Sequence, residues 1–290
     1  MITNLVVAGG GFKVIRMLGG LKYMEEHKDL KFINSYYGTS AGSLLCLMMS
    51  LGYSMPHIIK VFNEHCNDKL LTLKINIDRF FERYSLYDVS KFIKLLRTLI
   101  GCKLNPANPS EFKDVTLKEL YEKTKKKLTC TVVSLRDSKV KYFNYINQPN
   151  LPAYKLVQMS CAIPLIFEPV EWEGDLYIDG GVVDNFPYSA VPEYELPMTL
   201  GIGIKSITRS KDISYGDIVS FVSRIANISI NHSETRNLHN AIYVSVDERF
   251  DDNMIDADIT LEERMEMIDA GYNEVKQQLN VKKHVRRKSF

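Results

Sequence analysis

Apolar and polar positions near the start of the chain form two strand–turn–helix units in succession. Leu5–Ala8 is a short, unbroken apolar run of the kind found in buried strands, and three glycines follow it. A strand expected at Phe32–Tyr37 leads through a second glycine turn, Gly38–Gly42, into a helix over Ser43–Leu51 that Gly52 ends. Two such units predict a parallel sheet wrapped by helices. The first helix is expected where apolar residues recur at helical spacing, at Val14, Met17, Leu18, Leu21 and Met24.

From about residue 52 to residue 128 the pattern is helical and less regular, which we interpret as a helical insertion. Residues 88–100 present a broad apolar face that Gly101 closes, and a capping box of Thr116 and Glu119 opens a further helix. Such apolar faces are most often part of the core. An acyl-binding groove or an interfacial lid over a site is the alternative.

The remainder of the chain returns to alternating strands and helices. This alternation predicts an α/β fold, with three α/β/α layers around a mostly parallel central sheet, in one domain over residues 1–280. The basic stretch "KKHVRRK" falls in residues 281–290, for which we expect a flexible tail; contact with an anionic membrane or nucleic acid is the less favoured alternative. Strands are expected at 130–135, 140–145, 175–181, 198–204 and 241–246, and helices at 153–162, 215–235 and 260–279, the last opened by Thr260 and Glu263.

Composition excludes several classes of function for a chain with this fold. The chain has 290 residues with a net charge of +2, too near zero to argue for a nucleic-acid partner. Its five cysteines are odd in number and lack the spacing of metal ligands, so we expect no metal and a reducing compartment. "LVVA" is too short for a signal core, and no apolar run approaches the roughly 20 residues of a membrane span. We expect a cytoplasmic protein whose membrane contact, if any, is peripheral.

The pentapeptide Gly38-Thr39-Ser40-Ala41-Gly42 is the first candidate for chemistry. A sharp turn from strand to helix holds its serine in a strained conformation with the hydroxyl clear of the sheet. The flanking Gly38 and Gly42 remove Cβ atoms that would collide, and the following helix points its amides at Ser40. Ser40 is therefore a candidate nucleophile, and an ordinary tight turn is the alternative.

The base that would activate Ser40 has two candidates. Only one strand precedes that of Ser40, which is too early for the common Ser–acid–His hydrolase order, although His232 and His239 keep a triad open. Asp179 ends a predicted strand and is followed by Gly180 and Gly181, at the rim where α/β sites form. It is either a base acting directly on Ser40 or a turn residue that caps its own backbone.

The Gly9–Gly11 turn has two interpretations. It matches neither a P-loop nor a dinucleotide fingerprint, because the residues that should follow are absent. Its amides, those of Gly9, Gly10, Gly11 and Phe12, either cradle a phosphate or form an oxyanion loop beside Ser40, with Lys13 adding positive charge.

In combination these motifs resemble the patatin-like phospholipase family. "GGGFK", "GTSAG" and "DGG" occur in the family's order, and "SCAIPLIFEPV" (160–170) and "DGGVVDNFPYSAV" (179–191, with Asn185 and Pro187) resemble its flanking segments. The resemblance covers roughly 5–52 and 153–205. It implies a Ser40–Asp179 dyad without histidine, an acyl-enzyme, an oxyanion held by the glycine loop, no metal and no cofactor.

The resemblance also implies the substrate, an acyl ester of a lipid, and hence a phospholipase A-type acyl hydrolase meeting membrane phospholipid. A neutral lipase, thioesterase or general esterase with the same dyad is one alternative. The other is a weakly active lipid-binding or regulatory protein, because Val14 stands where the family usually has glycine. A valine there is expected to shift the loop and weaken the oxyanion hole.

Overall fold

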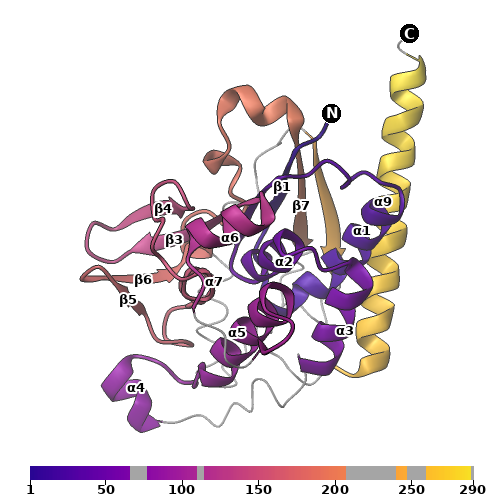
Figure 1. Cartoon of the computed structure of the whole chain (residues 1–290). Coiled ribbons are helices and arrows are strands. Elements are labelled where there is room, and N and C mark those ends of the chain that lie inside the picture. The colour runs from indigo at the N-terminus through magenta and orange to yellow at the C-terminus, as the bar shows by residue number, and fades with distance from the viewer. Residues whose placement is uncertain (66–76, 110–113, 207–239, 247–258, 289–290) are drawn as a thin grey trace.

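The structure, a computed structural model, describes residues 1–65, 77–109, 114–206, 240–246 and 259–288. At its centre is a mixed sheet whose strands are hydrogen-bonded in the order β5-β6-β3-β2-β1-β7-β8, with β4 also paired to β3 (Figure 1). Strands β8, β7, β1, β2 and β3 run parallel, whereas β4 and β6 are antiparallel to β3 and β5 is antiparallel to β6. The strands are β1 (Asn4–Val7), β2 (Ser35–Thr39), β3 (Lys127–Ser134), β4 (Lys139–Phe143), β5 (Val170–Trp172), β6 (Asp175–Asp179), β7 (Thr199–Ser206) and β8 (Ala241–Val246).

Helices flank this sheet, so the predicted α/β class with a mostly parallel core is confirmed. In the described part of the segment between β2 and β3 there are five of them, from α2 to α6. The helix expected at 215–235 lies outside the described residues. The α-helices are α1 (Val14–Glu26), α2 (Ala41–Ser50), α3 (Met55–His65), α4 (Ile77–Arg83), α5 (Ser90–Leu104), α6 (Leu117–Thr124), α7 (Ala153–Ser160) and α9 (Leu261–Lys288); short 3₁₀ helices are η1 (Gly11–Lys13), η3 (Gly180–Val182), η4 (Tyr188–Ala190) and η5 (Glu193–Met198).

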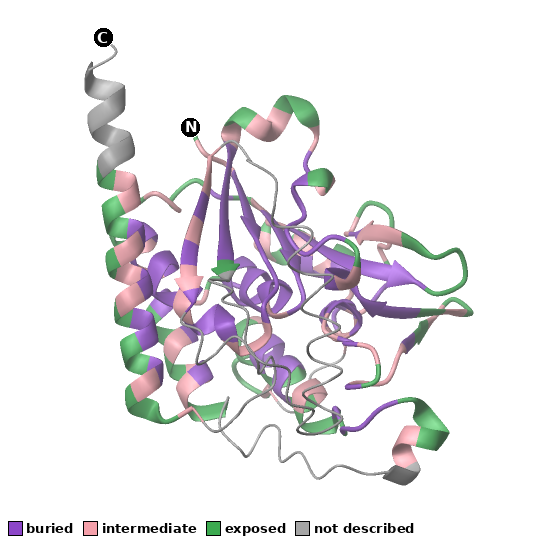
Figure 2. Ribbon diagram, turned by 180° about the vertical axis from the view of Figure 1, so that it is seen from behind, coloured by how far each residue is buried: buried purple, intermediate pink, exposed green. Residues whose placement is uncertain are grey.

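The two faces of the sheet are covered differently. Alternate residues of β1 belong to different clusters: Leu5 and Val7 to the large core shared with α1, α2 and α9, Val6 and Ala8 to a smaller one. On that second face the described cover is the segment around η4, with Phe186 and its neighbours. Viewed from behind, the central strands are buried along most of their length, and exposed residues lie on the outer helices and hairpin loops (Figure 2).

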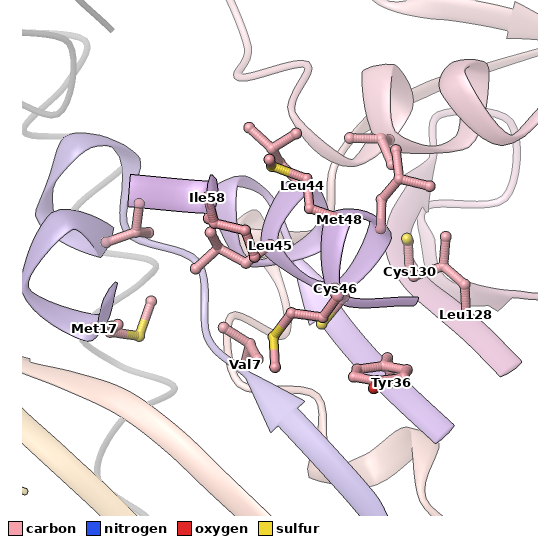
Figure 3. Close-up of a cluster of buried hydrophobic side chains, with 14 of the residues drawn as sticks. Val7, Met17, Tyr36, Leu44, Leu45, Cys46, Met48, Ile58, Leu128 and Cys130 are labelled. Carbon is pink, nitrogen blue, oxygen red and sulfur yellow. The ribbon is translucent and has the colours of Figure 1, made fainter. Parts of the chain in front are cut away.

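Helix α2 is buried on every side. All its residues from Gly42 to Ser50 are buried, and its side chains meet those of β1, β3 and α3 (Figure 3). A helix that is apolar all round belongs in a core rather than on a surface. Its N-terminus, directly after Ser40, is therefore attached to one of the most enclosed elements of the described fold.

Several boundaries differ from those expected. β2 begins at Ser35 rather than Phe32, which is half exposed in the preceding turn. Gly101 does not end its helix; α5 continues to Leu104, and Gly101 instead allows the backbone at Pro109 to approach. Both capping boxes are confirmed, by hydrogen bonds in each direction between Thr116 and Glu119 and between Thr260 and Glu263.

The last helix also extends beyond its expected end. α9 runs to Lys288, so residues 281–288 continue the helix expected at 260–279, and the flexibility of this end stays a prediction. Lysine and arginine are good helix formers and are favoured near helix C-termini, where they interact with the helix dipole. The short strand β5 was not anticipated, because three residues carry too little periodicity to be recognised.

Candidate active site

The register of the sheet brings the ends of β2 and β6 together. Thr39, the last residue of β2, pairs with Thr131 of β3, and Asp179, the last residue of β6, pairs with Val132. Since β4 pairs along the opposite edge of β3, strands β2 and β6 share one edge and meet end to end. Ser40, which follows Thr39, is therefore delivered to the end of the strand that carries Asp179.

Ser40 has the strained backbone expected of it. Its φ of 53° and ψ of −130° are a combination that residues with a side chain avoid. It is 5% exposed and is the N-cap of α2, whose first amides carry partial positive charge. A Cβ at Gly42 would collide with the carbonyls of Val7 and Ala8, so this glycine allows α2 to approach β1.

Hydrogen bonds on both sides of Ser40 hold this backbone. Its N–H donates to Ser160 Oγ at 3.0 Å, and the Ser160 hydroxyl donates to the Thr131 carbonyl at 2.8 Å. Its carbonyl accepts from the Ser43 N–H at 2.8 Å and from the Ser43 hydroxyl at 2.6 Å. The main chain of the candidate nucleophile is thus fixed from α7, β3 and α2.

Asp179 combines deep burial with an unpaired oxygen. It is 3% exposed; Oδ1 accepts from the Gly181 N–H at 2.7 Å, and Oδ2 is buried without a hydrogen-bond partner. Burial raises the pKa of this carboxyl to about 7, while the Ser40 hydroxyl and the Gly181 amide, which favour the charged form, offset this only in part. Oδ1 caps the backbone after Asp179, as the alternative from the sequence predicted. Oδ2 remains available to accept a proton.

The glycine loop after β1 lies directly against Ser40. A Cβ on Gly9 would come within 3.0 Å of the Ser40 Cβ, so only glycine fits there. Gly11 has a φ of 54°, in the left-handed region that favours glycine. The first hydrogen bond of η1 runs from the Lys13 N–H to the Gly10 carbonyl, so the amides of Gly11 and Phe12 precede it and have no partner within that helix.

Gly9 differs from its expected role. Its N–H donates to the Asn185 carbonyl at 3.0 Å and is not available to an oxyanion. The Asn185 side chain adds a second bond, in which Nδ2 donates to the Gly9 carbonyl at 3.3 Å, so the main chain and the side chain of Asn185 both hold Gly9. The Asn185 side chain is fully buried, and its Oδ1 has no partner. The candidate oxyanion donors are thus Gly10, Gly11 and Phe12.

Val14, the departure from the family pattern, is accommodated without distortion of the backbone. It starts α1 with φ −59° and ψ −20°, an ordinary helical conformation, and its side chain is 1% exposed. Lys13 beside it is also buried, at 5% exposed. The loop therefore does not need glycine at position 14 for conformational reasons, and an effect of Val14 on activity stays a prediction.

Two of the described histidines, His27 and His57, have partners of their own. His27 Nδ1 bonds the Tyr23 carbonyl and its ring stacks on Tyr23, and His57 Nδ1 bonds the Ser54 hydroxyl. His232 and His239 lie outside the described residues, so the triad alternative is untested. Among the described residues, no three His, Cys, Asp or Glu side chains gather as metal ligands would.

The structure brings together Ser40, Asp179 and the glycine loop, which the sequence had placed in three separate segments. It adds three residues to them. Asn185 was noted in the sequence only as part of "DGGVVDNFPYSAV", and no role was predicted for it. Ser160 was likewise noted only as the first residue of "SCAIPLIFEPV", without a role, and Thr131 had no signal, because an isolated threonine in an apolar strand is ordinary.

Comparisons with known proteins identify the family of the chain. The family model for patatin-like phospholipase matches residues 5–191. An uncharacterised protein of Acanthamoeba polyphaga mimivirus is 26% identical over 96% of this chain and 94% of its own length. A probable lipid hydrolase of Invertebrate iridescent virus 6 is 29% identical over 66% of this chain, which spans 63% of that protein. The fold of VipD from Legionella pneumophila superposes with a TM-score of 0.60 at 19% identity, over 97% of this chain and 67% of VipD. The chain belongs to the patatin-like phospholipase family.

Proposed function

We propose that this protein is a phospholipase A-type lipid acyl hydrolase in which Ser40 is the nucleophile and Asp179 the base. The observation that carries the proposal is the meeting of a strained, buried serine with a buried carboxylate that keeps Oδ2 unpaired. Family membership and the lipid hydrolase among its relatives support a lipid ester as the substrate.

In the first half of the reaction, ionised Asp179 takes the hydroxyl proton of Ser40 while Oγ attacks the ester carbonyl carbon. An ordinary aspartate is a poor base, but a carboxylate with a pKa of about 7 is matched to a proton transfer near neutral pH. The carbonyl oxygen gains negative charge, which the amides of Gly10, Gly11 and Phe12 and the N-terminus of α2 stabilise.

The tetrahedral intermediate collapses by breaking the bond to the ester oxygen, and the leaving alcohol takes the proton from Asp179. In the second half, Asp179 removes a proton from water, whose oxygen attacks the acyl carbon. Collapse returns that proton to Ser40 Oγ and releases the fatty acid. Both halves use the same base and the same oxyanion donors.

The protein is proposed to meet its lipid at a membrane surface. Within the part of the chain that the structure describes, no helix has both the length and the apolar character to cross a bilayer. α9 ends beyond the amino ends of the parallel strands, opposite the edge where Ser40 lies (Figure 1). Binding through the basic end of α9 would therefore turn the site away from that membrane, and the productive contact is expected at the carboxyl ends of the strands.

The decisive experiment measures fatty acid released from phosphatidylcholine vesicles by wild type, Ser40→Ala and Asp179→Asn, with Ser50→Ala as a buried-serine control. We expect release by wild type and the control, and loss of at least about a thousandfold in the two dyad variants. Equal release by wild type and Ser40→Ala rules the proposal out.

Parallel assays with diacylglycerol and a soluble short-chain ester separate a phospholipase from a neutral lipase or a general esterase. His232→Ala and His239→Ala variants test the remaining triad alternative. Both are expected to keep wild-type rates, because the proposed base is Asp179.

A further inference from the structure

The candidate nucleophile depends on a side chain from another part of the chain. Ser40 is buried, and its N–H donates to a side chain of α7 rather than to a carbonyl of the sheet or of α2. A buried N–H without a partner is strongly unfavourable. Ser160, fully buried at the end of α7, supplies the acceptor at 3.0 Å.

The same hydroxyl connects the nucleophile to the strand that carries the base. Ser160 donates to the carbonyl of Thr131, which pairs with Thr39 and precedes the residue that pairs with Asp179. A Cβ at Gly180 would also collide with this carbonyl, so the turn after Asp179 packs on the same atom. The Ser160 hydroxyl therefore fixes the position of the Ser40 backbone relative to β3, where the ends of β2 and β6 meet.

Asn185 plays the corresponding part for the glycine loop. Its main-chain carbonyl accepts from the Gly9 N–H, and its fully buried side chain donates from Nδ2 to the Gly9 carbonyl at 3.3 Å. Gly9 in turn lies between Asn185 and Ser40: a Cβ there would collide with Asn185 Oδ1 and come within 3.0 Å of the Ser40 Cβ. The position of the Gly10–Phe12 amides relative to Ser40 thus depends on a residue of the Asp179 segment.

We infer that Ser160 and Asn185 are positioning residues, of which Ser160 sets the backbone of the nucleophile and Asn185 sets the oxyanion loop. This inference rests on the proposed function. Neither side chain needs to touch the substrate; each acts through the geometry of Ser40 or Gly9. Small displacements of reacting groups are expected to lower kcat and to leave KM nearly unchanged, because substrate contacts are kept.

The test compares each residue with a buried residue of the same type that lies away from the site. Ser160→Ala is matched by Ser50→Ala, since the Ser50 hydroxyl is 1% exposed and donates to the Leu47 carbonyl at 2.7 Å near the far end of α2. Asn185→Ala is matched by Asn4→Ala, since Asn4 is 2% exposed and donates to Glu195 and Thr199 at the amino end of β1. Melting temperature, kcat and KM on a soluble ester, and the rate of Ser40 labelling by a fluorophosphonate are measured for all four.

We expect kcat and the labelling rate to fall about 10- to 100-fold in Ser160→Ala and Asn185→Ala, with KM within about threefold of wild type. The matched controls are expected to lose similar melting temperature and to keep kcat. A kcat loss no larger than in the controls overturns the inference.

If either alanine variant does not fold, Ser160→Cys and Asn185→Asp decide by the same criterion. The thiol is a weaker hydrogen-bonding group than the hydroxyl, and the aspartate keeps the shape of Asn185 but cannot donate to Gly9. A wild-type protein that neither hydrolyses ester nor is labelled at Ser40 would count against the proposed function itself, which is a distinguishable result.

Discussion

Each end of helix α2 is flanked by a residue with a positive φ angle, but the two residues are of different types. Before its N-terminus stands Ser40, with φ 53°, and just past its C-terminus stands Gly52, with φ 79°. Glycine adopts such angles without penalty, whereas serine at Ser40's combination of φ and ψ stores roughly 1–3 kcal/mol. One end of the helix therefore has the residue that suits the backbone, and the other has a residue that does not.

The polar groups at the two ends differ in the same way. At the C-terminus, Gly52 N–H bonds the Met49 carbonyl and Tyr53 N–H bonds the Met48 carbonyl, the Schellman pattern. Lys126 also donates to the Met49 carbonyl, and Lys103 donates to the Gly52 carbonyl. At the N-terminus, by contrast, Asp179 Oδ2 and Asn185 Oδ1 are buried without partners.

Unsatisfied groups and strain gathered at one end of a helix are what a reacting site requires. A cavity of about 550 Å³ lies beside the C-terminal end, lined by Lys28, Lys31, Lys126 and Tyr36 among others, and its position could suggest a ligand site. Yet the C-termini of α1 and α2, which carry partial negative charge, lie beside this cavity, and Lys126 already donates to the Met49 carbonyl at the end of α2. The proposed chemistry therefore belongs to the N-terminal end of α2, and the residues at the C-terminal end are expected to contribute stability alone.

The largest expected effect comes from replacing Ser40. Both Ser40→Ala and Ser40→Gly should abolish ester hydrolysis, by at least about a thousandfold. Only glycine adopts this backbone conformation without strain. We therefore expect the free energy of unfolding of Ser40→Gly to be about 1–2 kcal/mol higher than that of Ser40→Ala. Urea denaturation of both variants measures the difference. Equal stabilities would show that the serine turn is not strained.

The next effect is the pH dependence of hydrolysis. Asp179 must be ionised to accept a proton, and its pKa is raised to about 7. We expect kcat/KM on a soluble ester to rise about tenfold per pH unit below pH 7 and to level off above it. The midpoint should be unchanged in His232→Ala and His239→Ala. A flat profile from pH 5 to pH 9 would contradict Asp179 as the base.

The same carboxyl should make stability depend on pH. Its pKa is about 7 when folded against 3.8 as an ordinary value, so the unfolded chain releases this proton first as pH rises. The folded state is therefore progressively disfavoured between about pH 4 and pH 7. We expect Asp179→Asn to raise the free energy of unfolding by about 1–3 kcal/mol at pH 8 and by much less at pH 4. A gain that is equal at both pH values would argue against the raised pKa.

These predictions rest on features that the sequence reveals to different degrees. The strand–turn–helix units and Ser40 were predictable because their determinants are local: an apolar run, glycines at close spacing and a helical period. Asp179 was identified by its position at a strand end before two glycines. That Asp179 meets Ser40 depends on the register of β3 with both β2 and β6, which no local pattern encodes.

The groups that hold the site were not predictable. Ser160 and Ser40 are separated by 120 positions, and Asn185 and Gly9 by 176, so their hydrogen bonds exist only in the folded chain. Whether each amide of the glycine loop is free to bind an oxyanion also depends on the folded chain. Gly9 looks like Gly10 in the sequence, and only the fold shows that the Gly9 N–H is engaged by Asn185.

A smaller effect is expected when glycine is removed from the other end of α2. A Cβ at Gly52 would meet nothing within 4 Å, so Gly52→Ala should lose stability only through its left-handed φ, by about 1 kcal/mol. Asparagine tolerates this angle better, and Gly52→Asn is expected to lose less. Both variants should keep wild-type kcat. Thermal unfolding measures the loss of stability, and ester hydrolysis measures kcat. A fall in kcat would contradict the expectation that the C-terminal end of α2 contributes to stability alone.

The smallest effect is expected at Lys126. Its Nζ donates to the Met49 carbonyl at 3.2 Å, while burial and, secondly, nearby Lys103 lower the pKa of its ammonium. Because these effects oppose one another, we expect Lys126→Met to change the free energy of unfolding by no more than about 0.5–1 kcal/mol. Lys103→Met, at a more exposed cap, serves as the comparison. Hydrolysis of the soluble ester should stay within about twofold of wild type in both variants. A larger loss of kcat in Lys126→Met would mean that the C-terminal end of α2 transmits strain to Ser40, since the helix between them is packed on every side and does not yield locally.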